Sequence, residues 1–99
     1  MSGNYWLYTQ LSQKPNLSIS SRFHPVIIVE KDEVEYRIYT PNPEEYLIDV
    51  DVVQKAKSLG ANIISYPSSW CRASNEAISY GRIHKIRVVS HSELFSMLD

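Results

Sequence analysis

The sequence predicts a single α/β domain with a mixed β-sheet, in which an antiparallel hairpin is followed by a parallel β-α-β-α tail. Three observations support this prediction. Two strand-like runs flank a short charged turn in the first half, two further apolar runs follow in the second half, and segments with helical periodicity separate and follow them. At 99 residues the chain is long enough to bury one core.

Composition is typical of a folded globular protein, with 43% hydrophobic and 21% charged residues, and it argues against a disordered or fibrous class. Cys71 is the only cysteine, which excludes an internal disulfide and a zinc site built on paired cysteines. No apolar run approaches the ~20 residues of a membrane span, and the start of the chain does not resemble a signal peptide. We therefore expect a cytoplasmic protein without a membrane partner.

The first part of the chain gives weak signals. Residues 1–22 form an N-terminal segment of uncertain structure, and we assign residues 23–99 to the single α/β domain. Residues 5–8 fit either a short strand or the first turn of a helix. Residues 10–21, rich in Ser, Asn and Gln, are typical of a loop.

The hairpin is expected next. Residues 25–30 are a β-branched run, residues 34–40 alternate apolar and polar side chains, and the charged residues 31–33 between them indicate a turn. The two prolines in residues 40–44 end the second strand, because proline lacks the N–H that a central strand requires.

A helix over residues 49–59 should follow, with Asp49 as its N-cap and Gly60 just past its end in the left-handed region. Residues 61–65 are apolar without polar alternation, which indicates a buried parallel strand.

The tail contains two more helices and one more strand. We expect a helix over residues 72–80 that ends near Gly81, and a strand over residues 83–90. Ser90 and Glu93 have the spacing of a capping box for a C-terminal helix. Two successive strand-to-helix units imply right-handed crossovers and neighbouring parallel strands.

The order of these elements resembles the core of the PD-(D/E)xK superfamily, the restriction-endonuclease-like proteins, and in detail the Mrr-type branch. The resemblance extends over about three quarters of the chain. The matched positions within it are mainly apolar and glycine residues, in residues 26–32, 36–39, 56–61, 63–65, 75–80, 86–90 and 93–95. The resemblance implies a nuclease-type sheet flanked by helices.

The same resemblance implies a missing metal site. Such nucleases hold Mg²⁺ with an acid near the first hairpin strand and an acid-x-lysine, or glutamine-x-lysine, near the end of the second. Here these positions fall on His24 or Pro25 and on residues 39–41, which carry no carboxylate or lysine. Glu35 and Arg37 have acid-x-base spacing, but they lie early in the strand, and arginine is a poor replacement for lysine. We therefore predict no catalytic residues and no cofactor.

A weaker resemblance links the last fifty residues to BRCT domains, which bind phosphopeptides and DNA ends. That family has an additional strand where this chain has only the short gap between residues 65 and 73. It is ranked below the nuclease-like fold.

Charge is unevenly distributed although the formal net charge is only -1. Eight of the eleven acids lie within the 22 residues from Glu30 to Asp51. The C-terminal third is basic, and Arg82, Lys85 and Arg87 cluster there with His84. These cations are candidates for nucleic-acid contacts. Alternatively, they complement a helix dipole or pair with the acidic hairpin of another copy.

A second candidate is the loop over residues 65–72, where a parallel strand is expected to end and a helix to begin. Ser68, Ser69 and Arg72 could bind an anion or a nucleic-acid phosphate there. Alternatively, Ser69 only caps the helix and Trp70 packs on the apolar edge. Cys71 lacks the surroundings of a nucleophile and is interpreted as structural.

The three histidines lack metal-ligand spacing and are interpreted as surface or capping residues. The aromatic residues are too numerous for all of them to be buried in so small a core: seven Tyr, two Trp and two Phe. Exposed Tyr and Trp favour an interface, so we expect a homo-oligomer or a protein partner.

The predicted function is therefore binding: a non-catalytic restriction-endonuclease-like protein, acting as an oligomer or as an accessory subunit of a DNA-handling or mobile-element system. One alternative is a nuclease with an atypical active site, which would need Mg²⁺. The other is a small protein-interaction module of BRCT-like type.

Overall fold

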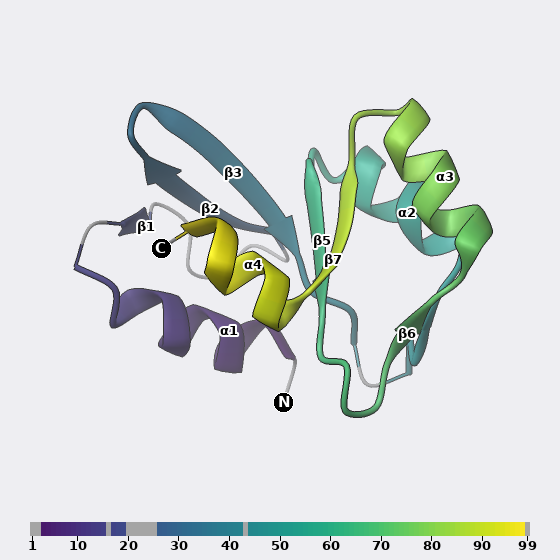
Figure 1. The fold of residues 1–99 in the computed structure, drawn as a ribbon, viewed down its shortest axis with the longest axis horizontal. Coiled ribbons are helices and arrows are strands. Elements are labelled where there is room, and N and C mark those ends of the chain that lie inside the picture. Colours follow the sequence, from purple (N-terminus) through teal and green to yellow (C-terminus); the bar gives the residue numbers. More distant parts are fainter. Residues whose placement is uncertain (1–2, 16, 20–25, 43, 99) are drawn as a thin grey trace.

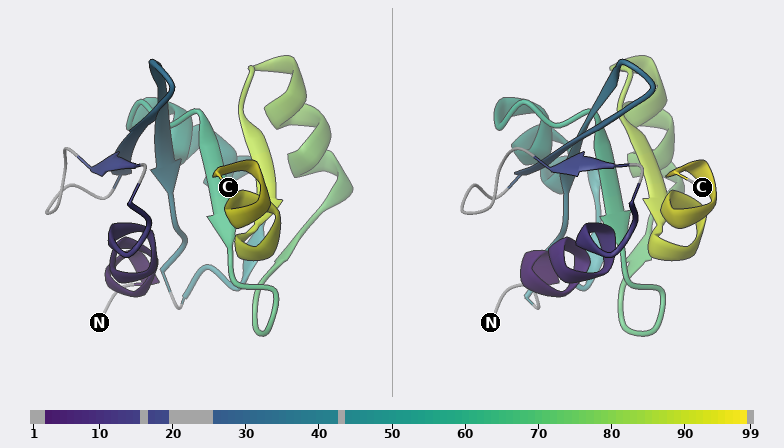
Figure 2. Two further views of the ribbon diagram at one scale, coloured as in Figure 1. Left: turned by 60° about the vertical axis from the view of Figure 1, so that its left-hand side comes forward. Right: turned by 90° about the vertical axis from the view of Figure 1, so that its left-hand side faces the viewer.

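The computed structural model describes residues 3–15, 17–19, 26–42 and 44–98 (Figure 1). Its centre is a five-stranded mixed sheet with the strand order β1-β2-β3-β5-β7. Helices α2 and α3 lie on one face of this sheet, and α1 and α4 lie on the other, as the two turned views also show (Figure 2). The predicted α/β class with a mixed sheet is confirmed.

The hairpin is present where the sequence predicts it. Strand β2 (Val26–Lys31) pairs antiparallel with β3 (Val34–Tyr39), and β1 (Ser18–Ile19) pairs antiparallel with the other side of β2. Asp32 and Glu33 form the turn, both with positive φ. This turn geometry matches the right-handed twist of the flanking strands and fixes the register.

The helix and the strand that follow the hairpin also agree with the prediction. Helix α2 (Val50–Ser58) has Asp49 as its N-cap, whose carboxylate accepts a hydrogen bond of 3.0 Å from Val52 N–H. Gly60 follows the helix with φ +87°. Strand β5 (Ile63–Tyr66) then pairs parallel with β3.

The next helix starts later than predicted. Helix α3 spans Asn75–Ile83, so the expected helix over residues 72–80 is wrong at both ends. Strand β6 (Arg72–Ala73) takes the first positions, and it pairs parallel with β4 (Leu47–Ile48) in a separate two-stranded sheet. Ser74, not Ser69, caps α3 by accepting a hydrogen bond from Ala77 N–H.

Gly81 does not end this helix, which continues to Ile83. Its role is close packing, because a Cβ at this position would lie 2.6 Å from the backbone oxygen of Ile86. Such a distance is far below van der Waals contact, so the helix can approach the following strand only with glycine here.

The parallel tail is completed by β7 (Arg87–Ser90), which pairs with β5, and by α4 (His91–Leu98). The predicted strand over residues 83–90 is therefore shorter at its start. The capping box is confirmed: Glu93 N–H donates to Ser90 Oγ at 3.2 Å, and Ser90 N–H donates to Glu93 Oε1 at 3.3 Å.

The N-terminal segment contains a helix, α1 (Gly3–Ser12), so residues 5–8 are helical. Part of the segment that was expected to be a loop, residues 10–12, also belongs to α1. Leu7 and Leu11 are fully buried against the sheet. His24 and Pro25, the positions where the nuclease resemblance would place a metal ligand, lie outside the described residues.

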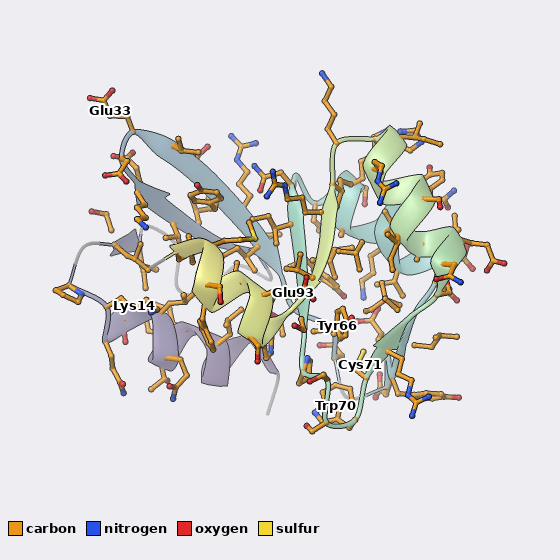
Figure 3. All side chains as sticks on the ribbon, in the orientation of Figure 1. Lys14, Glu33, Tyr66, Trp70, Cys71 and Glu93 are labelled. Carbon is orange, nitrogen blue, oxygen red and sulfur yellow. The ribbon has the colours of Figure 1, made fainter. Side chains whose placement is uncertain are left out.

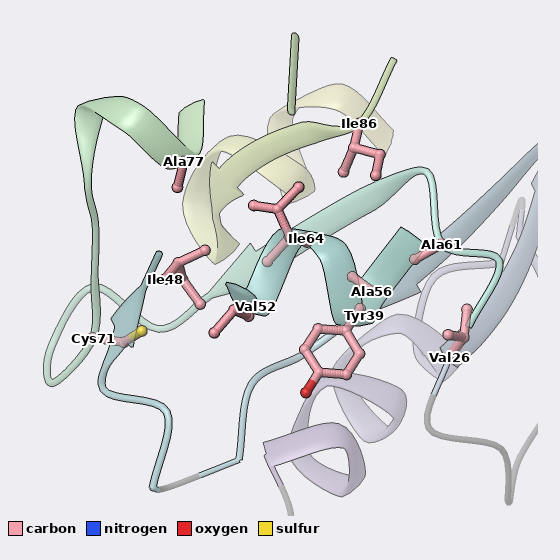
Figure 4. Packing of buried hydrophobic residues seen from close by; sticks show 11 residues of the cluster. Val26, Tyr39, Ile48, Val52, Ala56, Ala61, Ile64, Cys71, Ala77 and Ile86 are labelled. Carbon is pink, nitrogen blue, oxygen red and sulfur yellow. The ribbon is translucent and has the colours of Figure 1, made fainter. Parts of the chain in front are cut away.

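Each face of the sheet has its own apolar cluster. The cluster under α2 and α3 includes Tyr39, Val52 and Ile64 (Figure 4). The cluster under α1 and α4 includes Ile38, Ile63, Leu94 and Leu98 besides the two leucines of α1. Successive residues of β3 and β5 alternate between the two clusters, as the side chains of strands do. Among the described residues, no helix is long and apolar enough to cross a membrane.

Candidate nucleic-acid interface

The predicted site residues lie at opposite ends of the parallel strands. We call the end where β5 and β7 begin the N-terminal edge, and the end where they finish the C-terminal edge (Figure 1). Arg82, Lys85 and Arg87 lie at the N-terminal edge, around the connection from α3 to β7. Ser68, Ser69 and Arg72 follow β5 at the C-terminal edge. The two sets therefore form two candidate sites.

A groove of about 430 Å³ opens at the N-terminal edge, and we call it the edge groove. The groove follows from the register between β3 and β5. Ile63, the first residue of β5, pairs with Ile38 near the end of β3. Residues 34–37 of β3 therefore extend beyond the start of β5. The hairpin forms one wall, and the starts of β5 and β7 form the other. The lining residues are Val34, Glu35, Tyr36, Asn62, Ile63, Lys85, Arg87 and Met97.

Asn62 holds the two walls together, although sequence reasoning did not select it. Its Oδ1 accepts a hydrogen bond of 2.8 Å from Arg37 N–H, and its Nδ2 donates to the carbonyl of Glu35 at 3.3 Å. Its own carbonyl accepts from Arg87 N–H at 3.1 Å. One residue thus links β3, β5 and β7 at the base of the groove and fixes its shape.

The cations of this edge differ in whether they have a partner. Arg37 forms an exposed ion pair of 2.9 Å with Glu35, and Lys57 Nζ lies 3.2 Å from His84 Nδ1 at the ends of α2 and α3. Within the described part of the chain, Arg82, Lys85 and Arg87 have no acidic partner. All three are exposed, and Lys85 and Arg87 line the groove while Arg82 does not.

Helix dipoles explain only part of this cluster. Both α2 and α3 end at this edge, and Lys57 and Arg82 in their last turns complement the partial negative charge there. Lys85 and Arg87 lie beyond the helices, in the turn and in β7. Lys85 directly follows the C-cap His84, and its N–H donates to the Arg82 carbonyl at 3.3 Å. Because the dipole effect fades within the last turn, it does not explain Arg87 in β7.

At the C-terminal edge, Ser68, Ser69 and Arg72 are exposed, but the loop does not run directly into a helix. Strand β6 separates it from α3, whose Ala77 N–H is already bonded to Ser74. The helix N-terminus that motivated an anion site is therefore not at this loop. Anion binding by these three residues stays a prediction that rests on the hydroxyls and the guanidinium alone.

Trp70 and Cys71 of the same loop point in different directions (Figure 3). Trp70 is 42% exposed and does not complete the core, whereas Cys71 is buried. The Cys71 thiol donates to the Glu45 carbonyl at 3.3 Å, and burial raises its pKa. A protonated buried thiol is a poor nucleophile, so Cys71 is structural.

A hydrogen-bonded group around Glu45 stands just beyond the end of β3. Tyr39 Oη donates to Glu45 Oε1 at 2.6 Å, Asn42 N–H donates to the same oxygen at 2.9 Å, and Lys55 Nζ lies 3.2 Å from Oε2. Burial and the bond to Glu45 raise the pKa of Tyr39 to about 12. Burial alone would raise the pKa of Glu45, but its hydrogen bonds outweigh this and lower it. Glu45 is thus an internally satisfied carboxylate.

His91 is buried, so its interpretation as a surface or capping residue is wrong. It is the first residue of α4, and its Nδ1 lies 2.5 Å from the Oγ of the buried Ser65 at the end of β5. Burial lowers the pKa of His91 to about 4. The imidazole is therefore neutral near pH 7 and links β5 to α4.

Across the described residues, no group of three His, Cys, Asp or Glu side chains could hold a metal ion. The exposed polar groups of the N-terminal edge can instead bind anions by charge and by hydrogen bonds. Comparison of the chain with protein-family models, with curated proteins and with solved structures found no match.

Proposed function

We propose that this chain is a non-catalytic binding protein of restriction-endonuclease-like fold that holds nucleic acid at its N-terminal edge. One observation carries the proposal: Lys85 and Arg87 lie beyond the helix ends, line the edge groove, and have no acidic partner among the described residues. The order of hairpin, α2, β5, α3, β7 and α4 supports the fold assignment.

The groove also offers groups suited to a nucleic-acid strand. Lys85, Arg87 and the nearby Arg82 can each neutralise a phosphate, and most of the affinity for such a ligand comes from counterion release. Tyr36 is a half-buried lining residue that presents an aromatic ring on which a base could stack. The proposed role is that of an accessory or oligomeric component of a DNA-handling system.

Salt-dependent binding tests the proposal. Fluorescence anisotropy with labelled single-stranded and double-stranded DNA and with RNA should show an affinity that falls steeply with salt. Replacing Arg82, Lys85 and Arg87 with alanine should weaken binding and reduce the slope of log K against log[salt] by about 0.9 per cation for duplex DNA. Arg72→Ala tests the other predicted phosphate site in the same assay, because Arg72 is exposed at the opposite edge. Binding that is lost in Arg72→Ala and kept in the triple variant would contradict the proposal.

The same samples test the nuclease alternative. Incubation of each nucleic acid with Mg²⁺ or Mn²⁺ should leave it intact if the protein only binds. Reproducible cleavage that Glu35→Ala abolishes would overturn the non-catalytic assignment, because Glu35 is the one hairpin carboxylate with acid-x-base spacing.

A second candidate function, a protein-interaction module, is favoured by a different surface at the C-terminal edge. Tyr46, Leu47 and Trp70 are 69%, 45% and 42% exposed. Arg72 pairs with Leu47 across the β4–β6 ribbon, and its N–H donates to the carbonyl of Tyr46 at 3.0 Å. Trp, Tyr and Arg are the residues most enriched in binding hot spots. This candidate predicts no salt-dependent retention of nucleic acid.

A further inference from the structure

The N-terminal edge carries both signs of charge, separated along the molecule. The hairpin tip, which we define as Glu30, Asp32 and Glu33, is exposed at one side, where Figure 3 labels Glu33. The ends of α2 and α3 and the start of β7 lie at the other side of the same edge (Figure 1). The cations of this basic side that line the edge groove are Lys85 and Arg87.

Backbone strain singles out the same two places. Among the described residues, the non-glycine residues with positive φ are Asp32 at 52°, Glu33 at 67° and Lys85 at 61°. A left-handed conformation costs about 1 kcal/mol for a residue with a side chain, and turns of this kind favour Asn or Gly. All three positions carry charged residues at one end of the molecule. Such strain is a reason to look for a function of the side chains held there.

We propose that a second copy of this chain docks against the first, N-terminal edge to N-terminal edge, with the hairpin tip of each copy on the edge groove of the other. The turn between β2 and β3 and the start of β7 lie at the same end of the molecule, on its two sides (Figure 1). A two-fold rotation therefore brings each onto its opposite in the partner. The contact is isologous and closes at two copies.

The edge groove also offers apolar surface for such a contact. Val34, which lines the groove beside the tip, is 49% exposed and supplies apolar contact area. Because most of the paired groups are charged, the dimer should form at low salt and dissociate at high salt.

Docking would cover Lys85 and Arg87. If these residues also bind nucleic acid, which rests on the proposed function, the dimer and the nucleic-acid complex exclude each other. Dimerisation would then regulate access to the groove, and a polyanion would dissociate the dimer. The dimer itself does not depend on nucleic-acid binding.

Charge reversal provides the test. The tip variant is Asp32→Lys with Glu33→Lys, and the edge variant is Lys85→Glu with Arg87→Glu. Sedimentation velocity at low salt should show a concentration-dependent dimer for the unchanged chain and monomers for each variant alone. An equimolar mixture of the two variants should form a heterodimer, because the reversed tip of one copy then meets the reversed edge of the other. Glu76→Lys, exposed and outside this face, is the matched control and should still form dimers.

Two results would overturn the proposal. One is a chain that stays monomeric at low salt across the concentration range. The other is a dimer that survives both reversals but dissociates with Arg72→Glu or Trp70→Ala, which would place the interface on the β4–β6 ribbon. Nucleic-acid affinity of the same variants is scored separately. Loss in the edge variant with a gain in the tip variant supports the proposed function, whereas unchanged affinity in both contradicts that function without affecting the dimer.

Discussion

The two ends of the parallel strands differ in how their polar side chains are satisfied. At the C-terminal edge, Glu45 accepts hydrogen bonds from Tyr39 and Asn42, and Ser65 is bonded to His91. At the N-terminal edge, three exposed cations and an acidic hairpin tip have no ion-pair partner within the described residues. Open α/β sheets usually bind ligands at the C-terminal edge. In this protein these buried polar groups of the C-terminal edge are bonded to one another, whereas the cluster of unpaired cations among the described residues lies at the N-terminal edge.

Substitutions at the two edges should therefore have different effects. Substitutions in the hydrogen-bonded groups of the C-terminal edge should lower the free energy of unfolding, since they leave buried polar groups unpaired. Replacement of the exposed charges at the N-terminal edge should change binding and leave stability almost unaffected.

The largest expected effect is a pH dependence at the C-terminal edge. The pKa of His91 is about 4 in the folded protein and 6.5 for the unperturbed side chain. Between these values the unfolded chain binds more protons, so stability should fall as the pH drops from about 6.5 to about 4, by up to about 3 kcal/mol. Urea unfolding at several pH values measures this loss.

His91→Gln should be less stable at neutral pH and should lose that part of the pH dependence. His84→Gln is the matched control, because His84 is only partly buried, near the opposite edge. A pH dependence that persists in His91→Gln and disappears in His84→Gln would show that the buried histidine is not its source.

The second largest effect concerns the close contact between α3 and the backbone before β7 at the N-terminal edge. Gly81→Ala should lower the free energy of unfolding by about 2 kcal/mol, because the added Cβ meets the Ile86 carbonyl at 2.6 Å. The sign of the stability change is informative, because alanine without such a clash is favoured over glycine inside a helix by about 1 kcal/mol. Ser79→Ala, at an exposed position of the same helix, should change stability by less than about 0.5 kcal/mol. Stabilisation by Gly81→Ala would mean that the helix and strand do not approach this closely.

Local signals were sufficient to predict much of the fold. The hairpin, the Asp49 cap, the glycine after α2 and the Ser90–Glu93 capping box all depend on residues close in sequence, and the structure contains each of them. The start of α3 was not predictable in this way. Residues 72–73 are extended because β6 pairs with β4, which lies 25 residues earlier, and Ser74 is followed three residues later by Ala77 and not by Glu or Gln.

The candidate site was predictable only in part, for a similar reason. Lys85 and Arg87 are neighbours in sequence, so their clustering was visible. The opposite wall of the groove, Glu35 and Tyr36, and the connecting Asn62 depend on the register between β3 and β5. An apolar pattern indicates that strands are parallel but does not specify their register. The burial of His91 likewise follows from how α4 packs, which its position at the start of a helix does not reveal.

The smallest expected effect separates binding from stability at a single residue. Lys85 has φ +61°, so Lys85→Gly should relieve about 1 kcal/mol of strain, and the greater freedom of the unfolded chain should leave a net gain of about 0.5 kcal/mol. The same change removes one cation from the groove and should reduce the salt dependence of duplex-DNA binding by about 0.9 in slope. Arg87→Ala should give the same loss of slope without the gain in stability. A Lys85→Gly variant that is less stable but binds DNA as before would mean that Lys85 stabilises the turn and does not contribute to binding in the groove. The contrast between the two edges would then depend on Arg82 and Arg87 alone.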